Sequence, residues 1–162
     1  MVTKNDEGLW AAVVDAEREL HARRAAFYQK AQDRATILAG ALKGSAWERG
    51  AALSFLTGLS DDVPALLELL VDNSMTHAFA LDARRAIWSR RSAVQAQLQE
   101  SVERRLVTAD DDEYRRLAEL LDYLDDRETL RRLIQTALDS PDPEINEVGA
   151  DFGERDSLDS QT

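Results

Sequence analysis

Helix-start signals recur along this chain at a nearly constant spacing, and that spacing limits what the chain can fold into. They stand at Ser45, Thr76, Asp111 and Asp142, roughly 31 to 35 residues apart. Ser45 and Glu48 form an S-x-x-E capping box, in which the hydroxyl and the carboxylate each bond a backbone N–H that the helix leaves unpaired. Because a period of this length is typical of stacked helical hairpins, the sequence predicts an all-α array.

Each interval between two starts holds two stretches in which apolar residues have helical spacing. The first stretch places one apolar stripe on Trp47, Ala51, Ala52, Phe55, Leu56 and Leu59. Asp61 or Asp62 is expected to cap the second helix, with Pro64 in the first turn, where its missing N–H costs no hydrogen bond. An S-x-x-Q motif at Ser92 predicts a further start. We therefore expect about three hairpin repeats and a terminal helix in residues 45–153.

Two turn sequences carry a resemblance to a known family. Asp61–Pro64 separates two paired helices, and Ser140–Ile145 precedes the last one. On these residues, the chain from about Ser45 to Phe152 resembles HEAT-like α-solenoid repeats, which are antiparallel helix pairs joined by short turns. The resemblance implies a binding scaffold, although a few HEAT-like members are DNA glycosylases or lyases. The same amphipathic patterns also fit a closed bundle of about eight helices.

The two ends of the chain differ from the repeats. Residues 1–44 predict one or two helices that lie against the first repeat as an N-terminal cap and form one domain with it. Their apolar anchors are Trp10, Val13, Val14, Leu20, Phe27, Tyr28, Ile37 and Leu38. Residues 154–162 are polar and acidic, so we expect a disordered tail.

Length and composition fit one domain of a soluble cytoplasmic protein. The chain has 162 residues, of which 44% are hydrophobic, enough to build a core. No apolar run approaches the roughly 18 residues of a membrane span, and residues 1–11 lack the features of a signal peptide. The sequence contains no Cys, which excludes disulfides and thiolate metal sites.

The charge balance favours a basic protein as partner and argues against nucleic acid. With 31 acidic and 20 basic side chains, the net charge of −11 repels a phosphate backbone. Only a local groove of arginines would change that expectation. Arginine pairs that are candidates for such a groove stand at 23/24, 84/85, 90/91, 104/105, 115/116 and 131/132. Acidic neighbours on the same helices favour solvated, ion-paired faces instead.

The candidate partner-binding residues are acids at the predicted turns and leucines of one apolar segment. The acids are Asp61, Asp62, Asp110, Asp111, Asp112, Glu113, Asp125 and Asp126. They are suited to cap helices, but two or three stand where one would suffice, so stacked turns would form an acidic ridge. The leucines are Leu66, Leu69 and Leu70, within an almost wholly apolar segment that is covered by the N-terminal helix or exposed to a partner.

No catalytic, cofactor or metal motif is present in the sequence. His21 and His77 are the only histidines, neither has a nucleophile motif nearby, and the acids at 110–113 lack the Gly and the final Glu of an EF-hand loop. We therefore expect a non-catalytic protein-binding module that uses an apolar patch and acidic edges. An immunity protein or inhibitor of a basic toxin or nucleic-acid enzyme is one alternative. A HEAT-like DNA-binding or glycosylase-type protein, with Trp47, Trp88 and Tyr114 near an arginine groove, is the other.

Overall fold

The computed structural model describes residues 3–159, without the side chains of Lys4 and of residues 155–159, and this part of the chain is all-α with no β-strand. The helices are α1 (Lys4–Lys30), α2 (Arg34–Lys43), α3 (Ala46–Gly58), α4 (Leu67–Ser74), α5 (Ala80–Trp88), α6 (Arg91–Leu106), α7 (Asp111–Tyr123), α8 (Arg127–Leu138) and α9 (Pro143–Asp159). Two short 3-10 turns, η1 (Ser60–Asp62) and η2 (Pro64–Leu66), replace the predicted first turns of the helix after Asp61. The all-α prediction is confirmed.

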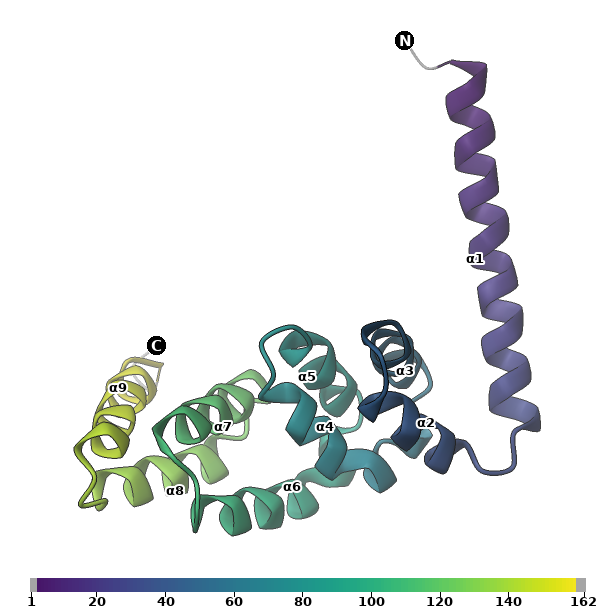
Figure 1. Cartoon of the computed structure of the whole chain (residues 1–162). Helices are drawn as coiled ribbons and strands as arrows, with labels where there is room; N and C mark the ends of the chain where they lie inside the picture. Colours follow the sequence, from purple (N-terminus) through teal and green to yellow (C-terminus); the bar gives the residue numbers. More distant parts are fainter. Residues whose placement is uncertain (1–2, 160–162) are drawn as a thin grey trace.

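Helices α2 to α9 form two rows, and the helices of one row run antiparallel to those of the other (Figure 1). One row holds α3, α5, α7 and α9, and the other holds α2, α4, α6 and α8. Neighbours within a row pack together, as α3 does with α5, and the rows pack on each other, as α4 does on α5. The predicted helical-repeat arrangement is therefore present, and α2 joins the array as its first helix.

Because the two rows are antiparallel, the turns of the array lie along two opposite edges, and each edge holds a different set of turns. The first turns of α3, α5, α7 and α9 and the turns that lead into them lie along one edge, here named the Trp47 edge. The turns from α3 to α4, from α5 to α6 and from α7 to α8 lie along the opposite edge, here named the Asp126 edge. Because α7 has 13 residues, the two edges are about 20 Å apart at a rise of 1.5 Å per residue.

The hydrophobic core lies between the two rows of helices. Its fully buried large side chains include Leu53, Leu56, Leu67, Leu70, Ile87, Leu117, Leu121 and Leu133. On α6, Val94, Leu98 and Val102 are buried, and neighbouring positions are largely exposed. This confirms the single narrow seam that the i+4 spacing predicts for that helix.

Ser, Thr and Asp side chains start most of the helices. Ser45 and Glu48 form the predicted capping box at α3, and the carboxylate of Asp142 accepts the N–H of Glu144 at 2.9 Å at the start of α9. Three predicted starts are wrong. Neither Asp61 nor Asp62 caps the helix that follows, because α4 and the two 3-10 turns before it have no side-chain cap. The hydroxyl of Thr76 donates to the carbonyl of Asn73, four residues before α5 begins, and Ser92 lies inside α6, which has no side-chain cap.

The N-terminal segment consists of two helices, and only part of it covers the repeats. Asp33 caps α2 by accepting the N–H of Thr36, and Arg34 donates to the carbonyl of Tyr28, which fixes the break between the helices. α2 packs on α3 and α4, whereas α1 extends away from the array and contacts it only through its last turns (Figure 1). The predicted anchors Trp10, Val13, Leu20 and Ile37 are exposed, so the expected cap is formed by α2 and the end of α1.

At the other end, α9 continues further than the sequence pattern indicates. Residues 154–159, predicted to be disordered, form the last part of α9, and residues 160–162 lie outside the described residues. Val148 and Phe152 are buried against the array and anchor the helix. Gly153 is a poor helix former but does not block a helix as Pro would, so α9 continues past it.

Candidate functional site

Asp61 and Asp62 hold the N-terminal helices to the array. Asp61 accepts hydrogen bonds from the hydroxyl of Tyr28 and from Arg90, and Asp62 accepts the Nε–H of Arg34 at 2.8 Å. The hydrogen bond from Tyr28 lowers the pKa of Asp61, and the same bond raises the pKa of Tyr28. Both predicted acids therefore have structural partners on the Asp126 edge.

Asp125 and Asp126 lie on the same edge and form the turn from α7 to α8. Asp126 is buried and caps α8. Its carboxylate accepts hydrogen bonds from the N–H of Thr129 at 3.2 Å and from the hydroxyl of Thr129 at 2.9 Å. Asp125 has a φ of 53° and accepts the Nε–H of Arg127 at 2.9 Å. The turn geometry and the cap account for both carboxylates.

The acids at 110–113 lie on the other edge, so the predicted single ridge is wrong. Asp110 caps α7 by accepting the N–H of Glu113 at 2.9 Å. Arg105 lies 3.9 Å from Glu113, and Arg116 lies 3.5 Å from Asp112. Asp110, Asp111 and Asp112 are exposed on the Trp47 edge, about 20 Å from the turn that holds Asp126.

The predicted apolar patch belongs to the core. Leu66 and Leu70 are buried and Leu69 is half-buried. α2 packs against both η2 and α4, which confirms the alternative that an N-terminal helix covers this segment. These leucines therefore stabilise the fold and are not available to a partner.

An exposed apolar surface that the sequence pattern missed lies on the Trp47 edge. Trp47 is 90% exposed, Leu81 is 50% exposed and Val107 is 82% exposed. Trp47 and Leu81 are each the second residue of a helix, and each is followed by a carboxylate, Glu48 or Asp82. Corresponding positions of successive repeats thus present an apolar side chain beside an acid.

The i+4 spacing from Trp47 to Ala51 and Phe55 placed Trp47 in the predicted core. Phe55 is buried, but Trp47 lies in the first turn of α3 and is exposed to solvent. The signal that identifies this surface is the apolar-acidic pair in the first helical turn, which recurs as Trp47-Glu48 and Leu81-Asp82. Periodicity along one helix cannot reveal it, because the pattern exists only between repeats.

At least one arginine of every pair except 23/24 bonds to an acid about one repeat away in the chain. Between α4 and α6, which are neighbours in one row, the Nη2 of Arg105 lies 2.9 Å from Glu68 and 2.8 Å from Asp72. Corresponding pairs in other repeats are Arg84 with Glu119 at 2.9 Å, Arg115 with Asp151 at 3.0 Å and Arg132 with Glu103 at 3.2 Å. Each pair joins residues 29 to 37 positions apart in the chain. The separation between the two residues of each pair is therefore close to the length of one repeat.

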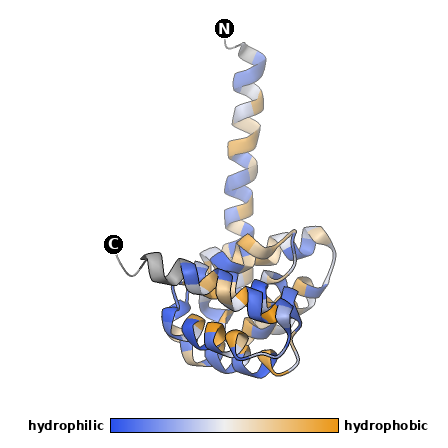
Figure 2. Ribbon diagram, turned by 90° about the vertical axis from the view of Figure 1, so that its left-hand side faces the viewer, coloured by the Kyte–Doolittle hydropathy of each residue, from blue (hydrophilic) through white to orange (hydrophobic). Residues whose placement is uncertain are grey.

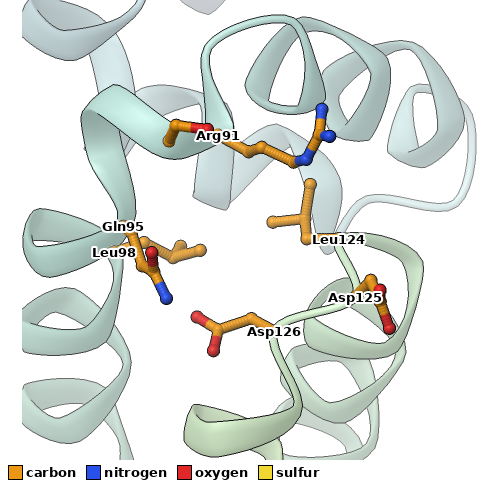
Figure 3. Close-up of a pocket in the computed structure, with 7 residues that line it drawn as sticks. Arg91, Gln95, Leu98, Leu124, Asp125 and Asp126 are labelled. Carbon is orange, nitrogen blue, oxygen red and sulfur yellow. The ribbon is translucent and has the colours of Figure 1, made fainter.

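A small cavity on the Asp126 edge has a volume of about 130 Å³ and lies between α6 and the turn from α7 to α8 (Figure 3). Gln95 and Asp126 point toward one another across it, whereas Asp125 points away (Figure 3). The guanidinium of Arg91 lies over the ring of Trp88, 3.8 Å from its centre. Small-molecule sites measure about 300 to 1,000 Å³, and Asp126 is engaged as a cap, so this cavity does not form a substrate site.

The described part of the chain holds no group of three His, Cys, Asp or Glu side chains placed to bind a metal ion. His21 and His77 are exposed and lie in α1 and before α5. Among the helices within residues 3–159, none has the length and apolar character needed to cross a membrane.

Comparisons with known protein families, with curated proteins and with solved structures give no match for this chain. The HEAT-like assignment therefore stays a prediction that depends on the turn sequences and the repeat spacing.

Proposed function

We propose that this protein is a non-catalytic helical-repeat scaffold that binds a basic protein through the Trp47 edge. The observation that carries the proposal is the 90% exposure of Trp47 beside exposed Leu81 and Val107. Tryptophan is enriched among the residues that dominate binding energy at protein interfaces. An exposed tryptophan on a rigid helix loses little conformational freedom when a partner covers it, which favours affinity.

The carboxylates of the same edge support a basic partner. Glu48, Asp82 and Asp110–Asp112 are exposed around the apolar side chains. Surface acids of this kind speed association with a positively charged protein and orient it, and salt weakens the effect. An inhibitor that covers the basic surface of a toxin or nucleic-acid enzyme is a narrower form of this proposal. The DNA-binding alternative is not favoured, because the arginines that would bind phosphates are bonded to acids of adjacent repeats.

The proposal is tested with Trp47→Ala and with Trp88→Ala as the matched control, because Trp88 is a partly exposed tryptophan at the end of α5, on the opposite Asp126 edge. Partners are captured from source cells at low salt with the wild type, identified by mass spectrometry and titrated by calorimetry. We expect Trp47→Ala to weaken binding by 30-fold or more, as about 2 kcal/mol for a dominant interface residue implies. Trp88→Ala should bind like the wild type.

A second variant tests the electrostatic part. Replacing both Asp111 and Asp112 with Asn should slow association about tenfold and reduce its dependence on salt, with little change in thermal stability. Capture of nucleic acid without a protein, or equal binding by wild type and Trp47→Ala, would overturn the proposal.

A further inference from the structure

Within residues 3–159, no other helix packs against the first five turns of α1. The contacts of α1 with the array are confined to its end, where Arg24 donates to Ser54 at 2.8 Å and the rings of Phe27 and Phe55 are 5.3 Å apart. Leu9 and Trp10 are 62% and 67% exposed, and Val13 and Leu20 are exposed as well. A helix of 27 residues spans about 40 Å, and helices without tertiary contacts are only marginally stable in water.

The exposed apolar residues of α1 form a seam suited to a second helix. Leu9, Val13, Ala16, Leu20 and Phe27 follow one another at intervals of three, four or seven residues, which is the spacing of a coiled-coil face. Figure 2 shows apolar residues at intervals along the protruding part of α1. The seam ends at Phe27, which is packed on the array.

An apolar groove adjoins the C-terminal part of this seam, at Leu20 and Phe27. It has a volume of about 330 Å³ and is lined mainly by Leu20, Phe27, Leu38, Ala41, Ala52 and Phe55. Leu20 and Phe27 belong to both the seam and the groove, so the two form one continuous apolar surface at the angle between α1 and the first hairpin. A bound helix that follows the seam would reach the groove.

The charges of α1 identify the occupant. Residues 4–19 carry two basic and five acidic side chains, a net charge of −3. Residues 20–30 carry Arg23, Arg24 and Lys30 with no acid, a net charge of +3. Two copies of α1 in antiparallel orientation bring each acidic half beside a basic half, whereas parallel copies bring like charges together.

We infer that the protein forms a dimer in which α1 packs antiparallel on α1 of a second copy and Trp10 of each copy enters the groove of the other. The seam from Leu9 to Phe27 has its midpoint near Arg18. Antiparallel pairing about that point places Trp10 of one copy level with Ala26 and Phe27 of the other, where the groove lies. The contact is isologous, so it closes at two subunits.

The mass of the full chain in solution tests association. Light scattering over micromolar concentrations should give twice the 18.1 kDa of one chain. Leu20→Asp in the seam and Arg23→Glu in the basic half should each weaken the dimer tenfold or more, and Asp15→Arg combined with Arg23→Glu should recover most of the loss. Trp47→Ala, which alters an exposed tryptophan outside α1, should leave the dimer unchanged. Circular dichroism verifies that each variant retains its helices.

Orientation is tested separately, and the absence of Cys from the sequence allows specific labelling. A spin label at Glu7→Cys should give a distance of about 30 Å or more between copies in the antiparallel pair, against about 10 Å in a parallel one. A monomer at all concentrations, a short label distance, or full dimerisation of Leu20→Asp would overturn the inference. Trp47→Ala separates this inference from binding at the Trp47 edge, because Trp47 belongs to that edge and not to the seam or the groove lining.

Discussion

Asp125 and Asp126 are adjacent acids with different effects on stability. Asp126 is buried and accepts two hydrogen bonds from Thr129 at the start of α8. Asp125 has a φ of 53°, in the left-handed region that costs most residues about 1 kcal/mol and that Gly adopts freely. Its bond to Arg127 is largely exposed, and exposed ion pairs contribute little.

We therefore expect Asp126→Ala to lower the free energy of unfolding by about 0.5 to 2 kcal/mol, because the first turn of α8 loses its cap. Asp125→Gly should change it by no more than about 0.5 kcal/mol, because relief of the backbone offsets the lost ion pair. Urea unfolding followed by circular dichroism measures both. Equal losses in the two variants would contradict this division of roles.

At the scale of elements, α9 approaches α8 closely at Gly149. A Cβ atom added at Gly149 would lie 2.9 Å from the backbone nitrogen of Leu138 and 3.0 Å from the Cβ of Ala137. The missing side chain of Gly149 thus allows α9 to pack on α8. Gly50, in the interior of α3, has no such neighbour within 4 Å.

Gly149→Ala should destabilise the protein by about 1 to 3 kcal/mol, because the backbone of α8 cannot move aside without strain. Gly50→Ala should stabilise it by about 0.5 to 1 kcal/mol through helix propensity alone. Thermal unfolding of the two variants gives opposite shifts of Tm if the packing of α9 is correct, and a stabilised Gly149→Ala would show that it is not.

The elements that local chemistry specifies could be predicted, and those that depend on tertiary contacts could not. Ser45, Glu48 and Asp142 act as caps because their bonds lie within one turn. Asp33 caps α2 within one turn as well, whereas the bond from Arg34 to Asp62, which joins α2 to a distant turn, has no local signal. Periodicity identifies the apolar residues of α1 but not whether another helix of the same chain covers them.

The candidate site was harder to predict than the fold for a physical reason. Acids at turns look alike in a sequence, but Asp126 caps a helix and Asp61 bonds to Tyr28, whereas Asp111 is exposed. Trp47 has the spacing of a core residue and differs only in its place in the first turn. Whether a side chain binds within the fold or faces a partner is decided by residues about 30 positions away.

At the scale of the whole molecule, ion pairs between repeats make the array sensitive to acid. Burial of Glu68 raises its pKa, but hydrogen bonds from Arg105, Ser101 and Arg104 outweigh that effect and leave the pKa lowered. Hydrogen bonds from Gln99 and Arg132 lower the pKa of Glu103. Glu68 bonds α4 to α6 and Glu103 bonds α6 to α8, so both carboxylates connect successive repeats.

The sign of the pH dependence follows from these shifts. A carboxylate whose pKa is lower in the folded state stabilises fully above its unfolded pKa, about 4.3 for Glu, and loses that contribution as the pH falls through its folded pKa. Stability should therefore be constant from pH 7 to about pH 5.5 and decrease steeply below about pH 4.

Glu68→Gln should be less stable than the wild type at pH 7 and should lose less stability on acidification. Glu100→Gln, at an exposed position of α6, should follow the wild type. The measurement is the urea midpoint at a series of pH values. A decline in Glu68→Gln as steep as that of the wild type would exclude the pairs of Glu68 as a source of the acid sensitivity.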